Sequence, residues 1–107
     1  MALKHLNFSF GGVPGASIPV EWAHSGVVGS GDMEVLLFRK AQQGQVNVKV
    51  CTPVSGFDHV WEMVLEKFVR DSGCGDLDLE INDNNATPFV VSLRLRQALL
   101  EARGGAL

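Results

Sequence analysis

The sequence is poor in the features that mark disulfide, membrane and nucleic-acid-binding proteins. It has two cysteines in 107 residues, Cys51 and Cys74, and their separation fits no metal-ligand spacing. No stretch approaches the roughly 18 consecutive apolar residues of a membrane span, and the N-terminus lacks an apolar signal core. Nine basic against twelve acidic residues leave a net charge of −3, with no basic stripe. We therefore expect a cytoplasmic protein with two free thiols rather than a disulfide, and no membrane or nucleic-acid partner.

The motifs of common nucleotide-binding and hydrolytic sites are also missing. There is no phosphate-binding loop of the Walker type and no dinucleotide fingerprint. A serine hydrolase elbow is a poor fit to Ser30, because Asp32 stands where that motif has its second glycine and a strand follows instead of a helix. His24 and His59 are candidate bases, but His59 is predicted on the outer face of a helix. We predict no metal site and no catalytic residue.

What the sequence does contain is the composition of one folded domain. Hydrophobic residues make up 46% and charged residues 20%, as in ordinary globular proteins. A chain of this length can bury a modest core without metal or disulfide. There is no internal repeat, so we predict a single domain over 1–107.

Alternating apolar and polar residues predict most of this domain to be strand. A glycine-rich break after the first strand opens a loop that reaches Trp22, and Pro53 ends a valine-rich strand. The strictly alternating acids of the segment 76–81 are typical of a solvated strand face that resists edge pairing. The predicted strands are 6–10, two arms of a hairpin within 27–38, 46–51 and 76–81.

One long helix is predicted between the third and fourth of these segments. Apolar residues recur at helical spacing from Phe57 to Phe68 and form one stripe. Ser55 precedes Asp58 by three residues, which is typical of a capping box, and Gly73 or Gly75 ends the helix. The stripe includes Trp61, which, like Trp22, is interpreted as a core or interface residue.

The C-terminal segment carries conflicting signals. Thr87-Pro88 is typical of a helix start, yet the apolar residues over 89–96 repeat every second position. We predict a strand over 89–96 and a short helix over 97–103. The fold class is then α+β: a mostly antiparallel sheet with one long helix packed on it and a short C-terminal helix.

The strongest functional candidate is Ser30, in the turn Gly29-Ser30-Gly31-Asp32. Its flanking glycines allow a sharp reversal and leave room for a bulky phosphate near the hydroxyl. Asp32 can position the serine or a metal ion during phosphoryl transfer, or simply hydrogen-bond its own backbone as a turn residue. Most such turns are only turns. Ser25 also precedes a glycine but lacks both the preceding glycine and the aspartate, so it ranks below Ser30.

The segment from Val27 to Leu37 resembles the acyl carrier (delta) subunit of malonate decarboxylase. The segments 47–52, 78–83 and 86–95, together with Trp61, are similar to the same family, so the resemblance covers about residues 6–102. The chain departs from the family pattern at Asn84-Asn85 and Phe89. The citrate lyase carrier subunit is related and shares a Ser-x-Asp arrangement, but its neighbouring residues look less similar.

The resemblance implies a carrier subunit. In that family the serine corresponding to Ser30 carries a covalent 2'-(5''-phosphoribosyl)-3'-dephospho-CoA arm, whose thiol holds acetyl or malonyl as a thioester. The implied partners are the acyl transferase and decarboxylase subunits and a prosthetic-group transferase. The alternatives are a citrate lyase type of carrier and an interaction module in which the Ser30 turn carries nothing.

Overall fold

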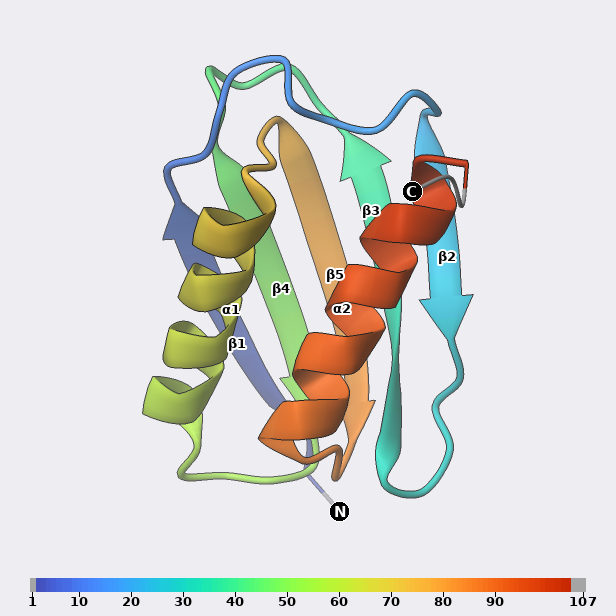
Figure 1. Cartoon of the computed structure of the whole chain (residues 1–107). Helices are drawn as coiled ribbons and strands as arrows, with labels where there is room; N and C mark the ends of the chain where they lie inside the picture. The colour runs from blue at the N-terminus through green and yellow to red at the C-terminus, as the bar shows by residue number, and fades with distance from the viewer. Residues whose placement is uncertain (1, 105–107) are drawn as a thin grey trace.

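The computed structural model describes residues 2–104, which form one mixed β-sheet with two helices packed on one face (Figure 1). The strands lie in the order β1-β4-β5-β3-β2 across the sheet. The elements along the chain are β1 (Lys4–Phe10), β2 (Trp22–Gly26), β3 (Asp32–Arg39), β4 (Val46–Thr52), α1 (Asp58–Ser72), β5 (Leu77–Asn84) and α2 (Pro88–Ala102).

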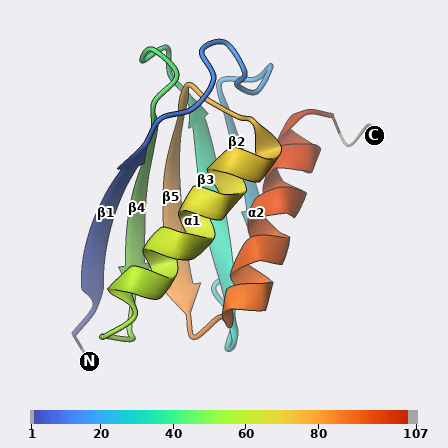
Figure 2. The ribbon, with the colours of Figure 1, turned by 60° about the vertical axis from the view of Figure 1, so that its left-hand side comes forward.

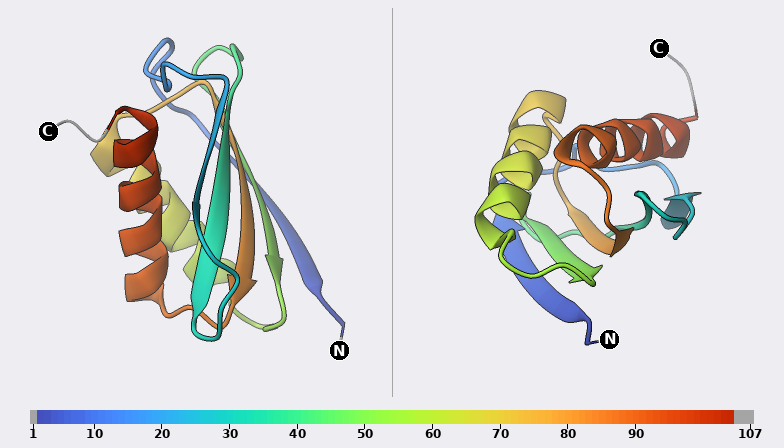
Figure 3. Two further views of the ribbon diagram at one scale, coloured as in Figure 1. Left: turned by 90° about the vertical axis from the view of Figure 1, so that its right-hand side faces the viewer. Right: turned by 90° about the horizontal axis from the view of Figure 1, so that it is seen from below.

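Three of the four strand pairings are antiparallel, and β4 with β5 is the parallel pair. Parallel neighbours need a crossover connection, which α1 supplies. The second helix, α2, packs on the same face of the sheet as α1, as the turned views show (Figures 2 and 3). The predicted α+β class and the mostly antiparallel sheet are confirmed.

The core lies between the sheet and the two helices. Every second residue of β3, β4 and β5 points into it, because successive side chains of a strand alternate between faces. The helices contribute a matching set at helical spacing, including Leu65 and Leu95. The fully buried apolar strand residues are Met33, Val35, Leu37, Val46, Val48, Val50, Leu77, Leu79 and Ile81.

The helix α1 is confirmed over most of its predicted length. Trp61, Leu65 and Phe68 are buried, and Gly73 ends the helix in the left-handed conformation with φ +66°. The predicted capping box is wrong: Phe57 occupies the N-cap position, and no side chain caps the first turn. Ser55 lies two residues before that position, too early to reach the free amides of the helix.

The predicted strand over 89–96 is wrong, because these residues form the first half of the 15-residue helix α2. The Thr87-Pro88 signal decides the outcome: the Thr87 hydroxyl accepts a hydrogen bond from the Val90 amide, and Pro88 occupies the first turn. The period of two arises because Phe89 and Leu93 are 70% and 42% exposed on the outside of the helix. The predicted short helix over 97–103 is the second half of α2.

The acidic segment 76–81 also differs from its prediction. Strand β5 begins at Leu77 and lies in the centre of the sheet, so its acids protect no edge. Asp76 precedes the strand with φ +55°, and its buried carboxylate accepts hydrogen bonds from the backbone amides of Gln42, Gly44 and Gly15. These bonds hold its pKa below the ordinary value. Asp76 is thus a structural residue that joins two loops.

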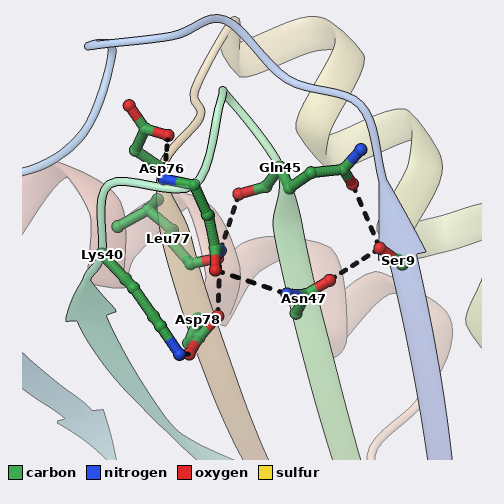
Figure 4. Close-up of polar contacts among 8 residues, drawn as sticks. Ser9, Lys40, Gln45, Asn47, Asp76, Leu77 and Asp78 are labelled. Carbon is green, nitrogen blue, oxygen red and sulfur yellow. Dashed lines mark hydrogen bonds and ion pairs between the residues drawn. The ribbon is translucent and has the colours of Figure 1, made fainter.

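Polar side chains continue from Asp76 across the open face of the sheet (Figure 4). Asp78 forms an ion pair with Lys40 at 3.8 Å. The Ser9 hydroxyl lies 2.6 Å from Asn47 Oδ1 and 3.1 Å from Gln45 Oε1. This cluster lies at the end of the sheet where β5 begins, opposite the β2–β3 turn (Figure 1).

The remaining expectations for single residues have mixed outcomes. Cys51 and Cys74 are free thiols, as predicted. Trp61 is a core residue, whereas Trp22 is 60% exposed and lies outside the core. None of the helices within residues 2–104 is long and apolar enough to cross a membrane. Residues 1 and 105–107 of the predicted domain lie outside the described part of the chain.

Replacing the two candidate capping residues tests the corrected helix starts. We expect Thr87→Ala to lower the free energy of unfolding by about 1 kcal/mol, because the hydroxyl that caps α2 is lost. Ser55→Ala is the matched control and is expected to leave stability unchanged, because Ser55 caps no helix. Urea unfolding at neutral pH measures both. A larger loss from Ser55→Ala than from Thr87→Ala would contradict the assignment.

Candidate functional site

Ser30 lies exposed in a tight turn at the tip of the β2–β3 hairpin. The Asp32 amide donates to the Gly29 carbonyl at 3.0 Å, and Gly31 has φ +74° while Ser30 does not enter the left-handed region. A positive φ at the third residue alone is the pattern of a type II turn. The hairpin and its tip are therefore confirmed. Val27 and Val28, expected in its first arm, instead lie exposed in the connecting loop.

The turn is held against the central strand. The Gly31 amide donates a hydrogen bond of 2.8 Å to the Asn84 carbonyl, and Asp32 pairs with Asn84 in the sheet register. Because β3 extends beyond the end of β2, this end of the hairpin is anchored to β5 and not to its own partner strand. The position of Ser30 thus depends on the end of β5.

The two glycines beside Ser30 leave open space. A Cβ added at Gly31 would meet no atom within 4 Å, and one added at Gly29 would meet only the Val27 side chain at 3.7 Å. By contrast, a Cβ at Gly75 would come within 2.1 Å of the Val13 backbone. Close packing against Val13 explains why residue 75 is a glycine, whereas the described residues leave the space beside Gly29 and Gly31 free. Within residues 2–104, no side chain hydrogen-bonds to the Ser30 hydroxyl.

Asp32 is oriented by an arginine that was not among the predicted site residues. Arg94 of α2 makes two parallel contacts of 2.8 Å with the Asp32 carboxylate, through Nε and one terminal nitrogen. Its other terminal nitrogen donates to Gln97. The Arg94 hydrogen bonds are the main cause that lowers the pKa of Asp32, and a bond from the Met33 amide adds to it. A planar bidentate pair fixes orientation as well as charge.

The other candidates do not join this site. Ser25 is 7% exposed within β2, so its hydroxyl is less accessible than that of the exposed Ser30. His24 lies 2.9 Å from Glu34, and this bond is the main cause that lowers the pKa of Glu34. His59 is exposed on α1, as predicted, and lies 4.0 Å from Glu62 of the same helix. In the described part of the chain, no three His, Cys, Asp or Glu residues are grouped so as to hold a metal ion.

The sequence profile of the malonate decarboxylase delta subunit, an acyl carrier protein family, matches residues 20–102. The chain belongs to this family.

Individual family members support the same assignment. The malonate decarboxylase acyl carrier protein of Malonomonas rubra is 54% identical over 94% of this chain and 90% of its own length. The corresponding protein of Xanthomonas euvesicatoria is 40% identical over 95% of this chain and 97% of its own length. A chain in the crystal structure of a Pseudomonas malonate decarboxylase hetero-tetramer in complex with malonate is 38% identical, with a TM-score of 0.77 over 92% of this chain and 98% of that one. The carrier fold is thus shared along nearly the whole length.

The Asp32–Arg94 pair predicts a specific change in acid stability. Because the folded-state pKa of Asp32 is lowered, its contribution to stability is present above its ordinary pKa of 3.8 and disappears as the pH falls through the lowered value. Arg94→Gln removes the main cause of the shift, so the free energy of unfolding should fall less steeply from about pH 5 to about pH 2.5 than in the unaltered chain. Urea unfolding across this range measures the slopes.

The matched control for this experiment is Arg96→Gln. Arg96 is an exposed residue of the same helix and makes no ion pair within residues 2–104. Its variant should follow the pH profile of the unaltered chain. Equal slopes for the Arg94→Gln variant and the unaltered chain would show that the pair does not lower the pKa of Asp32.

Proposed function

We propose that Ser30 is the attachment site of a 2'-(5''-phosphoribosyl)-3'-dephospho-CoA arm, and that residues 1–107 act as a non-catalytic carrier domain in the cytoplasm. The observation that carries this proposal is the exposed Ser30 hydroxyl, which has no side-chain partner within residues 2–104 and is flanked by open space, in a member of an acyl carrier family. Gly29, Gly31 and Asp32 support the attachment turn.

The residues of the turn fit such a group. Attachment forms a bond between Ser30 Oγ and phosphorus, while the hydroxyl loses its proton and the phosphoryl donor loses its leaving group. The space beside Gly29 and Gly31 admits a phosphodiester that a Cβ at either position would crowd. The turn is fixed by the Asn84 carbonyl, so the hydroxyl is presented in a defined position. When bound, the arm supplies a terminal thiol that holds acetyl or malonyl as a thioester.

The proposed partners are the acyl transferase and decarboxylase subunits, together with the transferase that attaches the arm. The related chain of known structure comes from a malonate decarboxylase hetero-tetramer, which supports an assembly of this kind. A tethered acyl group reaches two active sites at a high effective concentration, without diffusing through solution. In this proposal Cys51 and Cys74 take no part, because the arm brings its own thiol.

The mass of the protein tests the attachment site directly. We expect protein from a host growing on malonate to gain the mass of one arm on the peptide that contains Ser30. Ser30→Ala should abolish this gain and leave the free energy of unfolding nearly unchanged, because an exposed hydroxyl buries little surface. Ser25→Ala is the matched control and should keep the added mass. An unmodified chain from such a host would refute the carrier assignment.

Two further substitutions test how Asp32 acts. We expect Asp32→Asn to slow attachment, as measured by the rate of mass gain with the purified prosthetic-group transferase. If Asp32 acts by holding the turn through Arg94, then Arg94→Gln should slow attachment to a similar extent, and the double variant should be no slower than either single one. If Asp32 acts directly at the serine, only Asp32→Asn should be slow. Unchanged rates in both variants would remove Asp32 from the site.

A further inference from the structure

An apolar groove lies between the beginnings of the two helices. One wall is formed by Val60, Trp61 and Val64 in the first turns of α1. The other is formed by Ala86, just before α2, and by Val91 within α2. Its volume is about 230 Å³. The groove uses the N-terminal part of the apolar stripe of α1, where Val60 and Val64 are half-buried while Leu65 further along is fully buried. The core therefore covers these two valines only in part, and they leave apolar surface in the groove.

The beginnings of α1 and α2, which line the groove, and the β2–β3 turn lie at the same end of the molecule (Figure 1). The groove and the turn are also directly connected through β5. Asp83 and Asn85 line the groove, and the carbonyl of Asn84 between them accepts the hydrogen bond from Gly31. A group attached to Ser30 thus starts next to the strand end that borders the groove.

The polar atoms of the groove select a neutral occupant. Its deepest polar residues are Thr52 and Asp83, which are 0% and 7% exposed. The Thr52 hydroxyl donates to one oxygen of the Asp83 carboxylate at 2.8 Å, and the Ala86 amide donates to the other at 2.9 Å. The lining contains no lysine, arginine or histidine. A second carboxylate entering the groove would meet Asp83 without a compensating cation and would lose its hydration.

The size of the groove restricts the occupant further. Pockets that enclose a whole drug-sized ligand have volumes of roughly 300–1,000 Å³. The groove is smaller, so it fits the end of a long flexible group and not the whole of it. An acetyl thioester with the adjoining methylene groups is neutral, largely apolar and of this size class.

We propose that this groove receives the acetyl-thioester end of the arm on Ser30 and excludes the malonyl form. The inference rests on the proposed function, because it requires an arm at Ser30. It assigns Val60, Trp61 and Val64 as the residues that shield the acetyl thioester from water. The malonyl thioester, with its free carboxylate, stays outside and accessible to a partner subunit.

Trp61 provides a readout that is independent of enzyme activity. The sequence has two tryptophans and no tyrosine, so Trp22→Phe leaves Trp61 as the single strong fluorophore. In this background we would compare the thiol, acetyl and malonyl forms of the loaded full-length chain, each verified by mass. We expect the acetyl form to reduce quenching of Trp61 by acrylamide and to shift its emission to shorter wavelength. The malonyl form should behave like the free thiol.

The rate of thioester cleavage by hydroxylamine gives a second measurement. We expect the acetyl thioester on the protein to be cleaved several-fold more slowly than acetyl-CoA, and Val60→Glu to abolish this protection. The matched control is Met63→Glu in the same helix, where the side chain is exposed and does not line the groove. Phe57→Glu, at the exposed rim, repeats the test without a change inside the helix. Circular dichroism verifies that each variant is folded.

Failure of this inference is distinguishable from failure of the proposed function. If mass shows the arm on Ser30 but Trp61 responds equally to the acetyl and malonyl forms, or to neither, the groove assignment is overturned and the carrier assignment stands. A Trp61 response to added partner subunits alone would assign the groove to a protein contact and would also overturn it. If no arm is attached, the Ser30→Ala chain is titrated with S-acetyl-N-acetylcysteamine, which reproduces the acetyl-thioester end of the arm. An unchanged Trp61 signal then rejects the assignment of the groove to that end.

Discussion

The pairing of β5 on both of its edges determines where α1, the serine turn and the groove lie. On one edge β5 runs parallel to β4, so the connection must cross over the sheet, and α1 covers one face as a result. On the other edge it is antiparallel to β3, so β5 ends where β3 begins. Asn84 at this end can therefore hold Gly31. One strand thus places both the serine turn and the groove between the helices.

The two ends of the sheet are fixed by different kinds of interaction. At the end where β5 begins, the Asp76 carboxylate gathers three backbone amides from two loops, which ties those loops to the sheet. At the other end, the hydrogen bond from the Gly31 amide to Asn84 and the Asp32–Arg94 pair hold the Ser30 turn. Within residues 2–104, a Cβ added at either glycine of the turn would meet no atom nearer than the Val27 side chain at 3.7 Å. The first arrangement serves folding. The second keeps a hydroxyl in place while leaving the space around it free.

Local signals in the sequence predicted the hairpin, the long helix and the strand 46–51, because each depends on alternation or helical spacing within a short segment. The prediction of a strand over 89–96 was wrong because the exposed Phe89 and Leu93 produce an apolar residue at every second position. Thr87-Pro88 marked the true helix start. Ser30 and its turn were predictable from glycine spacing. Arg94 was not, because its partner Asp32 lies 62 residues away and only the packing of α2 on the sheet brings them together.

Two connections join the serine turn to the groove. One passes through the backbone of β5, from Gly31 to Asn84 and its groove-lining neighbours. The other passes through α2, where Arg94 binds Asp32 one turn after Val91, which lines the groove. Both ends of the path that the proposed arm would follow therefore belong to the same two elements, β5 and α2. Since the cost of bringing a tethered group to its site grows with the conformations that the tether can adopt, a fixed attachment point favours intramolecular binding in the groove.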